Sequence, residues 1–389
     1  MTTIQNDIKY NLELFNIYNI NSDIYYDICL KAVNYNEFLL KYVSHNKINN
    51  INKYYNICYN AIKKNGFALE YVINIFNYNK YLKLCLCAVK NAGLAIRHIK
   101  NKFKTYKICL NAVSNDGFAL LYIKNQYYNI CYQSVLQNGL TLEYININLH
   151  SNELYNIAVC NNGIALKFVK NQTYDLCYNA LFTYNNNNNL YIPDQHPFKY
   201  IHFNLFTDNE IFKLALLSIK KDPRIIIYFN KNINNLSLIN KKKLINLSKP
   251  QLFYLYKKAI LNNNSCIKYI IPKHQTLKLC LLSLNNNINN LNFITNKSDK
   301  LYIEIVKNNG LNLEFLKYQT EEICYNAILN NHNSFKFVKN ITYDLCIRLI
   351  ENYKKNNYND KLIYNNIINN IKLSNNNNLL IDILTYLFI

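Results

Sequence analysis

Twelve cysteines are the first residues of this 389-residue sequence whose chemistry could define a function. Thiolates bind zinc, attack electrophiles and form disulfides. A zinc site needs several ligands in close sequence or space, and the sequence has no Cys-x-x-Cys pair and no matching pair of histidines. Nine cysteines instead recur at one position of a repeated pattern, which predicts small buried core residues rather than reactive thiols. They are Cys29, Cys58, Cys85, Cys109, Cys131, Cys177, Cys280, Cys324 and Cys346.

Histidines and carboxylates offer a second source of chemistry. His196 and His202 share a polar segment with Asp194 and Asp208, a set that suits a metal or an acid–base pair. The spacing matches no known metal or catalytic motif, which favours an ordinary polar loop. His98 stands where other copies of the repeat carry Tyr or Phe, so we interpret it as a packing residue. The sequence predicts no catalytic residue, no metal site and no cofactor.

Five lysines form the candidate ligand-binding set. Each lies 15 residues after the repeated cysteine position, which we call the anchor: Lys100, Lys124, Lys170, Lys317 and Lys339. In a stacked repeat, equivalent positions form one edge, and ammonium groups with nearby tyrosines can follow a phosphate backbone and stack bases. The alternative is that lysine is favoured at a helix C-terminus by the helix dipole and binds nothing.

The six glycines exclude one large class of enzymes. All of them, Gly66, Gly93, Gly117, Gly139, Gly163 and Gly310, occupy the same position, eight residues after the anchor. None remains for a phosphate-binding loop, and no Walker or dinucleotide-binding pattern is present. At this position the sequence predicts a left-handed glycine that ends a helix.

These residues are positioned by a repeat. Its clearest copy runs from Cys58 to Val72, and the anchors follow one another at intervals that settle near 22 residues. They fall at positions 29, 58, 85, 109, 131, 155, 177, 215, 256, 280, 302, 324 and 346. Periods of roughly 20–50 residues are typical of solenoids, in which each copy buries its apolar face against the next.

The pattern within a copy is helical. Apolar or small residues fall at the anchor and 3, 4, 10, 11 and 14 residues later, steps that place them on one face of paired helices. Four residues before the anchor stands a Ser or Thr that can cap a helix start. These residues are Thr105, Ser151, Thr173, Thr276, Ser298, Thr320 and Thr342. The sequence therefore predicts a first helix of about ten residues and a shorter second helix, for example Ala119 to Ile123.

The repeated phrase Cys-x-x-Ala-Val/Ile-x-x-Asn-Gly-x-Ala-Leu-x-Tyr-Val-x-Asn resembles a family of short helical repeats that is catalogued only as a domain of unknown function. The family is found in giant DNA viruses of amoebae and in some intracellular bacteria. The similarity covers residues 58–177 and 301–346 best, while residues 184–296 depart from it, with Pro223 or Asn264 in place of glycine. The resemblance implies helical repeats and a viral origin, and it brings no catalytic residue or established ligand.

The predicted architecture is an all-α solenoid with five segments. They are an N-terminal cap (1–22), a first array (23–183), an inserted Asn- and Pro-containing loop (184–210), a second array (211–355) and C-terminal capping helices (356–389). Residues 379–389 are apolar but too short to cross a bilayer, which takes about 20 residues, and they read as a closing helix. With no signal segment in residues 1–20, we expect a soluble intracellular protein without a membrane partner.

These features predict a non-enzymatic scaffold that binds a protein partner, because repeat arrays expose long surfaces whose side chains can vary from copy to copy. The alternative is a nucleic-acid-binding array that uses the lysine edge. The net charge of +21 suits that alternative, but AT-rich codon usage explains the same excess of Lys, Asn, Ile and Tyr. An enzyme is the third hypothesis, and it requires a deep pocket with convergent polar groups in the inserted loop.

Overall fold

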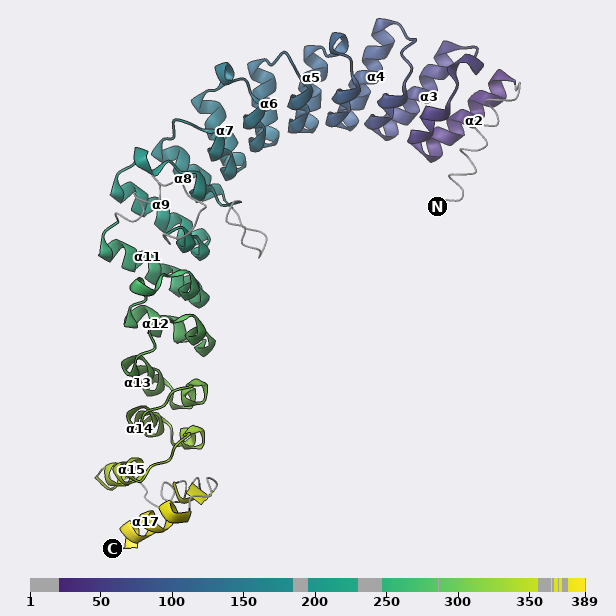
Figure 1. The fold of residues 1–389 in the computed structure, drawn as a ribbon. Helices are drawn as coiled ribbons and strands as arrows, with labels where there is room; N and C mark the ends of the chain where they lie inside the picture. Colours follow the sequence, from purple (N-terminus) through teal and green to yellow (C-terminus); the bar gives the residue numbers. More distant parts are fainter. Residues whose placement is uncertain are drawn as a thin grey trace. The chain divides into compact units, whose positions relative to one another are not determined.

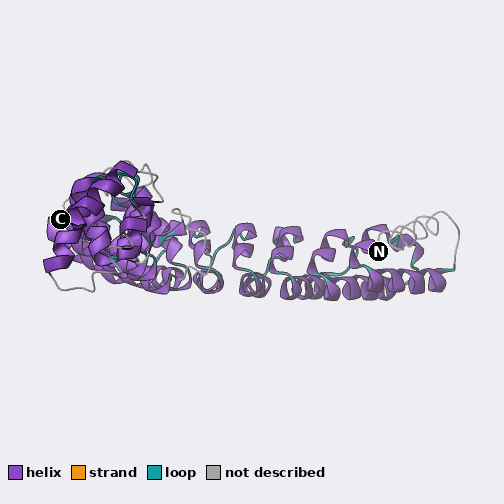
Figure 2. Ribbon diagram, turned by 90° about the horizontal axis from the view of Figure 1, so that it is seen from below, coloured by secondary structure: helices purple, strands orange, loops and turns teal. Residues whose placement is uncertain are grey.

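The computed structural model describes residues 21–184, 195–229, 247–285, 287–355, 365, 367–369, 371–372 and 377–388. All regular structure in these ranges is helical, and none of it is strand (Figure 2). Consecutive helices pack pairwise along the chain, so the predicted all-α solenoid is confirmed. No helix in the described ranges is long and apolar enough to span a membrane.

The chain forms two compact units, Met1–Phe206 and Thr207–Ile389. A layer of either unit consists of one α-helix and the 3₁₀ helix that follows it. In the first unit the α-helices lie side by side in chain order (Figure 1), and the 3₁₀ helices form a second row above them (Figure 2). The α-helix row and the 3₁₀ row form the two broad faces of this unit.

The α-helices of the first unit are α2 (Ser22–Tyr35), α3 (Ile51–Lys64), α4 (Tyr78–Asn91), α5 (Tyr106–Asn115), α6 (Tyr128–Gln137), α7 (Asn152–Asn161) and α8 (Tyr174–Thr183). Their 3₁₀ partners are η1 (Glu37–Tyr42), η3 (Gly66–Tyr71), η4 (Gly93–His98), η6 (Gly117–Tyr122), η7 (Gly139–Tyr144), η9 (Gly163–Phe168) and η11 (Pro197–Tyr200). Shorter 3₁₀ turns, η2 (His45–Lys47), η5 (Asn101–Phe103), η8 (Ile147–Leu149) and η12 (Phe203–Leu205), lie in the connections.

The second unit repeats the arrangement. Its α-helices are α9 (Asp208–Lys221), α11 (Lys249–Asn262), α12 (Leu277–Leu284), α13 (Asp299–Asn308), α14 (Glu321–Asn330), α15 (Tyr343–Lys355) and α17 (Asn377–Phe388). The 3₁₀ helices are η13 (Pro223–Phe229), η14 (Asn264–Tyr269), η16 (Ile288–Phe293), η17 (Gly310–Phe315) and η18 (His332–Phe337), with the short η15 (Pro272–His274) between layers. The predicted closing helix is confirmed as α17, which packs against α15.

The second helix of each layer is 3₁₀ and not α, and the predicted left-handed glycine is wrong. In most layers the α-helix ends at an extended Asn or Asp, such as Asn65 with φ −147° and ψ 118°, and α4 ends at an extended Ala92. The side chain of Asn65 accepts a hydrogen bond from the Phe67 amide at 3.0 Å and so begins the 3₁₀ helix immediately. Because the first helix ends on an extended residue, no left-handed turn is needed, and none of the six glycines has a positive φ.

The Ser and Thr residues that the sequence predicts as helix caps do cap the starts of their α-helices. Each of the seven predicted Ser and Thr residues accepts a hydrogen bond from the amide three residues later, as Thr105 does from Ile108 at 3.4 Å. The predicted length of about ten residues holds for α5 to α8 and for α13 and α14. In α2, α3, α4, α9 and α11 an apolar or aromatic residue such as Tyr54 replaces the cap, so the helix starts four residues earlier and spans 14 residues.

The core lies between the two rows and contains the residues predicted from the repeat. All nine anchor cysteines are buried, with at most 3% of each side chain exposed. Ala61, Ala88 and Ala112, three residues after their anchors, are fully buried. Residues this small let neighbouring helices approach closely, which is why short helices that would be marginal alone are stable in the stack.

The segment predicted as an inserted loop, 184–210, contains helices in the part that the structure describes. Pro197–Tyr200 and Phe203–Leu205 are 3₁₀ helices, and α9 begins at Asp208. Phe198 is fully buried, and η11 packs against η9, so this segment supplies the 3₁₀ helix of the α8 layer. Residues 185–194, most of the predicted N-terminal cap (1–20) and much of the C-terminal segment before α17 lie outside the described residues.

Candidate binding surface

An amide group joins each layer to the next, and the sequence analysis missed it. We call the residue six positions after the anchor the clamp residue. Asn91, the clamp residue of α4, accepts a hydrogen bond from the Gly66 amide at 2.9 Å and donates one to the Lys63 carbonyl at 2.9 Å. One side chain therefore satisfies both backbone groups left free where the preceding α-helix passes into its 3₁₀ helix.

The clamp recurs along both units. Asn115, Asn161 and Asn330 make the same pair of hydrogen bonds, with lengths of 2.6–3.0 Å. Gln137 accepts from the Gly117 amide at 2.7 Å, and Lys64 donates to the carbonyl of Asn34 in the same way. Part of the high Asn content thus has a structural role in addition to the predicted codon bias.

The clamp requires close contact between layers, which explains the glycines. A Cβ built on Gly66 would lie 2.3 Å from the carbonyl oxygen of Ala88 in the next α-helix. The other five glycines meet a carbonyl of the following layer at 2.2–2.7 Å. Since a backbone atom cannot move aside without shifting its helix, only glycine is tolerated here, for lack of space and not for its φ.

A second amide holds the end of the 3₁₀ helix. The Gln319 side chain donates to the Phe337 carbonyl at 3.1 Å and accepts from the Lys339 amide at 3.0 Å and from the Cys324 thiol at 3.7 Å. Gln126, Gln172 and Gln275 bridge the equivalent backbone groups of their layers. In layers of the longer helices Tyr25 and Tyr54 accept from that amide instead.

The cysteines are free thiols without a catalytic setting. Burial raises the pKa of Cys58, Cys85 and Cys177 to about 12, so these groups stay protonated at neutral pH. The thiol is then a small apolar core group with a weak donor, as predicted. Cys160 is exposed. In the described ranges no group of three or more His, Cys, Asp or Glu side chains could hold a metal ion.

The predicted histidine set is not brought together as a site. His196 is buried, and its Nδ1 accepts from the Phe198 amide at 3.1 Å, which makes it the cap of η11. His202 lies within 3.2 Å of the Lys170 carbonyl through Nδ1. Asp194 lies outside the described residues, and Asp208 starts α9 in the other unit. His98 packs edge-on against Phe67, and burial lowers its pKa, which agrees with a packing role.

The five predicted lysines are exposed, directly after the 3₁₀ helices. Lys100, Lys124 and Lys170 belong to the first unit, where the intervening α6 layer carries Asn146 at the same position. Lys317 and Lys339 occupy successive layers of the second unit, and the ammonium group of Lys339 donates to the carbonyls of Leu316 at 3.1 Å and Lys317 at 2.8 Å. The first unit thus carries an interrupted basic edge, and Lys339 also stabilises the stack.

A row of aromatic side chains accompanies these lysines. The last residue of the 3₁₀ helix, or in η13 the last but one, is aromatic in the described layers of the two arrays, and it lies 13 positions after the anchor except for Tyr200 of η11, which follows Cys177 by 23 positions. The row consists of Tyr42, Tyr71, His98, Tyr122, Tyr144, Phe168 and Tyr200 in the first unit and of Tyr269, Phe293, Phe315 and Phe337 in the second, with the more buried Tyr228 inside η13. The sequence carries Tyr or Phe at this position, and on the pattern alone we interpret the position as one that serves packing.

These aromatic side chains are only partly used in packing. Tyr122 is 37% exposed, Phe293 44% and Phe315 49%. The residue before them varies in charge: Lys41, Arg97, Lys167, Lys268 and Lys336 are basic, and Glu70, Glu143 and Glu314 are acidic. Several lysines lie over the adjacent ring, such as Lys167 at 4.4 Å from the Phe168 centroid. The 3₁₀ row therefore presents a constant aromatic group beside a variable charge.

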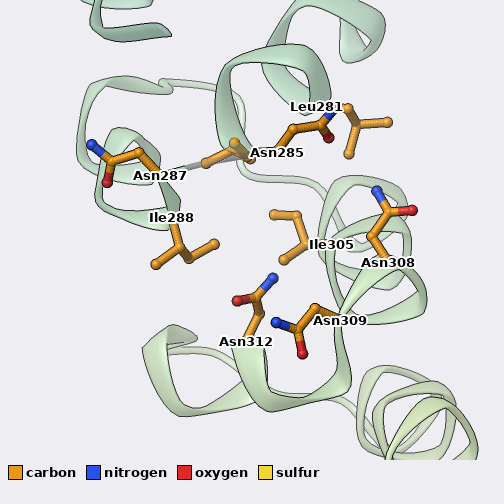
Figure 3. A pocket seen from close by; sticks show the side chains of 9 residues that line it. Leu281, Asn285, Asn287, Ile288, Ile305, Asn308, Asn309 and Asn312 are labelled. Atoms are coloured by element: carbon orange, nitrogen blue, oxygen red, sulfur yellow. The ribbon is translucent and has the colours of Figure 1, made fainter.

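The junction between the α12 and α13 layers is open. Between α12–η16 and α13–η17 lies a pocket of about 280 Å³, bordered by Leu284, Ile288 and Ile305 and by the amides of Asn285, Asn308 and Asn312 (Figure 3). Asn308 is the clamp residue of α13, yet no hydrogen bond joins its side chain to another residue in the described part of the chain.

Comparison with known proteins gives no match among protein-family models, curated proteins or solved structures. The predicted membership of the helical-repeat family and the predicted viral origin therefore stay predictions. Any argument about function has to come from the surfaces described above.

Proposed function

We propose that the chain is a non-enzymatic helical-repeat scaffold whose 3₁₀ row binds an extended segment of a partner protein. The observation that supports it is the aromatic row: a ring at the end of the 3₁₀ helix in nearly every described layer, partly exposed except for the buried Tyr228. Aromatic side chains are enriched among the residues that dominate protein interfaces, because a ring buries a large area for little conformational entropy.

The charges beside the rings favour a protein partner over a uniform polyanion. Glu70 and Glu143 alternate with Arg97 and Lys167 along the first unit. A phosphate backbone would be repelled by these carboxylates, whereas a polypeptide can match an alternating pattern with charges of its own. Constant anchors with variable neighbours are also the arrangement by which repeat proteins acquire specificity.

A displayed peptide library selected on the purified chain tests this proposal. We expect related sequences to be enriched and their affinity to fall at least about tenfold for the triple variant Tyr122→Ala, Tyr144→Ala, Phe168→Ala, because truncation of an interface aromatic side chain commonly costs more than 1 kcal/mol. The matched control removes three exposed rings from the α-helix row, Tyr59→Ala, Tyr106→Ala, Tyr178→Ala. Equal binding to both variants would place the partner elsewhere and overturn the proposal.

Single-stranded nucleic acid is the second candidate. It is favoured by the layers in which cations flank the ring on both sides, as Lys167 and Lys170 flank Phe168 and as Lys336 and Lys339 flank Phe337. Rings can stack bases while the ammonium groups bind phosphates. Anisotropy with a labelled poly-uridine oligonucleotide should then show affinity falling steeply with salt, and Lys100→Gln, Lys124→Gln, Lys170→Gln should flatten that slope. A slope unchanged by these substitutions would exclude the lysine edge as the binding surface.

A further inference from the structure

The open junction differs from the next junction along the chain, α13–α14, at two facing positions. At six junctions a glycine of one layer meets the backbone of an alanine or serine of the next, as Gly310 meets Ala327. Between α12 and α13 the equivalent residues are Ile288 and Ile305. Both isoleucines border the pocket, and Figure 3 shows their side chains facing the same space. Two branched side chains cannot approach as closely as glycine and alanine, so the layers stay apart at this end.

The separation leaves the clamp unmade. At the closed junction Asn330 accepts from the Gly310 amide and donates to the Lys307 carbonyl, both at 2.7 Å. The corresponding groups at the open junction are the Ile288 amide, the Asn285 carbonyl and the side chain of Asn308. In the described residues no hydrogen bond joins Asn308 to either backbone group, and all three residues line the pocket.

The groups around this pocket are complementary to one functional group. Elsewhere in the chain a primary carboxamide fits between such an amide and such a carbonyl, donating with its nitrogen and accepting with its oxygen. An external carboxamide in the pocket can make the same pair of bonds to Ile288 and Asn285, and the free amide of Asn308 can add a third. Leu284 and Ile305 supply an apolar base for the methylenes that carry it. The volume of about 280 Å³ is ample for such a side chain.

We propose that the α12–α13 junction is a binding pocket for the side-chain carboxamide of a glutamine or asparagine in the partner. The inference rests on the proposed protein-binding function and names one group of that partner. It does not use the aromatic row of the first unit, so a failure of one site leaves the other testable. The ligand amide takes the place that the clamp residue occupies at the closed junctions.

Ligand-observed saturation-transfer NMR with the probe acetyl-Ala-Gln-Ala-methylamide tests the pocket on the full chain. We expect saturable transfer to the glutamine methylenes and about tenfold weaker binding when methionine replaces glutamine, since two hydrogen bonds to the backbone are lost. Asn308→Ala should weaken the glutamine probe about fivefold. The control Asn333→Ala removes an exposed amide of η18 outside the pocket and should leave binding unchanged.

A pocket-closing variant separates binding from folding. Ile288→Gly with Ile305→Ala restores the residues of a closed junction, so we expect Asn308 to form its clamp and binding of the probe to disappear while the chain stays folded. Absence of transfer to the wild-type chain would overturn the proposal, as would equal binding of the glutamine and methionine probes. Loss of peptide selection on the Tyr122, Tyr144, Phe168 variant with retention of this probe would show that the two sites act separately.

Discussion

The junctions on the two sides of α13 differ, since one is closed and the other is open. Towards α14 the layers are closed: Gly310 lies against the Ala327 carbonyl, and Asn330 bonds to both free backbone groups. Towards α12 they are open: Ile288 and Ile305 line a pocket between the layers, and Asn308 makes no such bonds to the residues that the structure describes. An asparagine stands at the clamp position on both sides, Asn330 and Asn308, and we infer that the space at the facing residue pair decides whether its amide binds its own chain.

The largest effect is expected from forcing the closed junction open. Gly310→Ala places a Cβ 2.2 Å from a backbone oxygen, and we expect a loss of about 3 kcal/mol in unfolding free energy, at the upper end for overpacking. Urea unfolding followed by circular dichroism, with hydrogen exchange of α13 and α14, measures it. Ile288→Ala at the open junction is the matched control and should cost about 1 kcal/mol, because a half-buried side chain is shortened without a clash. Equal losses would mean that the contact at Gly310 can relax.

The second largest effect is expected from removing the clamp residue, and its size should differ between the closed and the open junction. Asn330→Ala leaves the Gly310 amide and the Lys307 carbonyl without their partner, and we expect a loss of about 2 kcal/mol. Asn308→Ala removes no hydrogen bond to the described part of the chain and should change stability by less than about 0.5 kcal/mol. The same denaturation experiment compares the pair. A loss at Asn308 as large as at Asn330 would show that α13 is already clamped to α12 in solution.

Closing the open junction should protect one backbone amide, that of residue 288, from hydrogen exchange. In the variant Ile288→Gly, Ile305→Ala we expect exchange of the residue-288 amide to slow about tenfold, because it gains the bond that the Gly310 amide already has. Mass spectrometry of exchanged peptides from η16 and η17 gives both values in one sample. If the residue-288 amide exchanges as fast as in the wild type, factors besides the two isoleucines hold the layers apart.

The smallest effect concerns a surface ion pair at the next junction. Arg348 of α15 donates to Glu322 of α14 at 2.6 Å, and this bond lowers the pKa of the glutamate below its ordinary 4.5. The pair therefore stabilises the fold above that value, and its contribution is lost as pH falls through the lowered pKa. Both side chains are about half exposed, so we expect Glu322→Gln to cost no more than about 0.5 kcal/mol at pH 7 and nothing near pH 2. A cost that persists at pH 2 would point to packing instead of charge.

The helical period, the caps and the buried cysteines could be predicted from the sequence because each depends on residues close together in one copy. Thr105 caps an amide three residues away, and Cys109 and Ala112 lie on one helical face. Such local rules need no knowledge of the neighbouring layer.

The clamp and the glycine contact could not be predicted in the same way, because each joins two copies. Gly66 was interpreted from its own turn, whereas its role depends on the Ala88 carbonyl of the next helix. The five lysines were found at an exposed edge by counting. The open junction was not found, because it depends on two residues from different copies, Ile288 and Ile305, that line one pocket. A comparison of facing positions in adjacent copies is the signal that could have found it.

The clamp also bears on how an array of this kind can change its length. Each of the layers of α4 to α7 carries a glycine that contacts the following layer and an amide that bonds to the preceding layer, as Gly139 and Gln137 do in one layer. Excising or duplicating a whole period within this run therefore brings a complete glycine–amide pair together at the new junction. Arrays can thus grow or shrink by recombination without a new interface having to be invented.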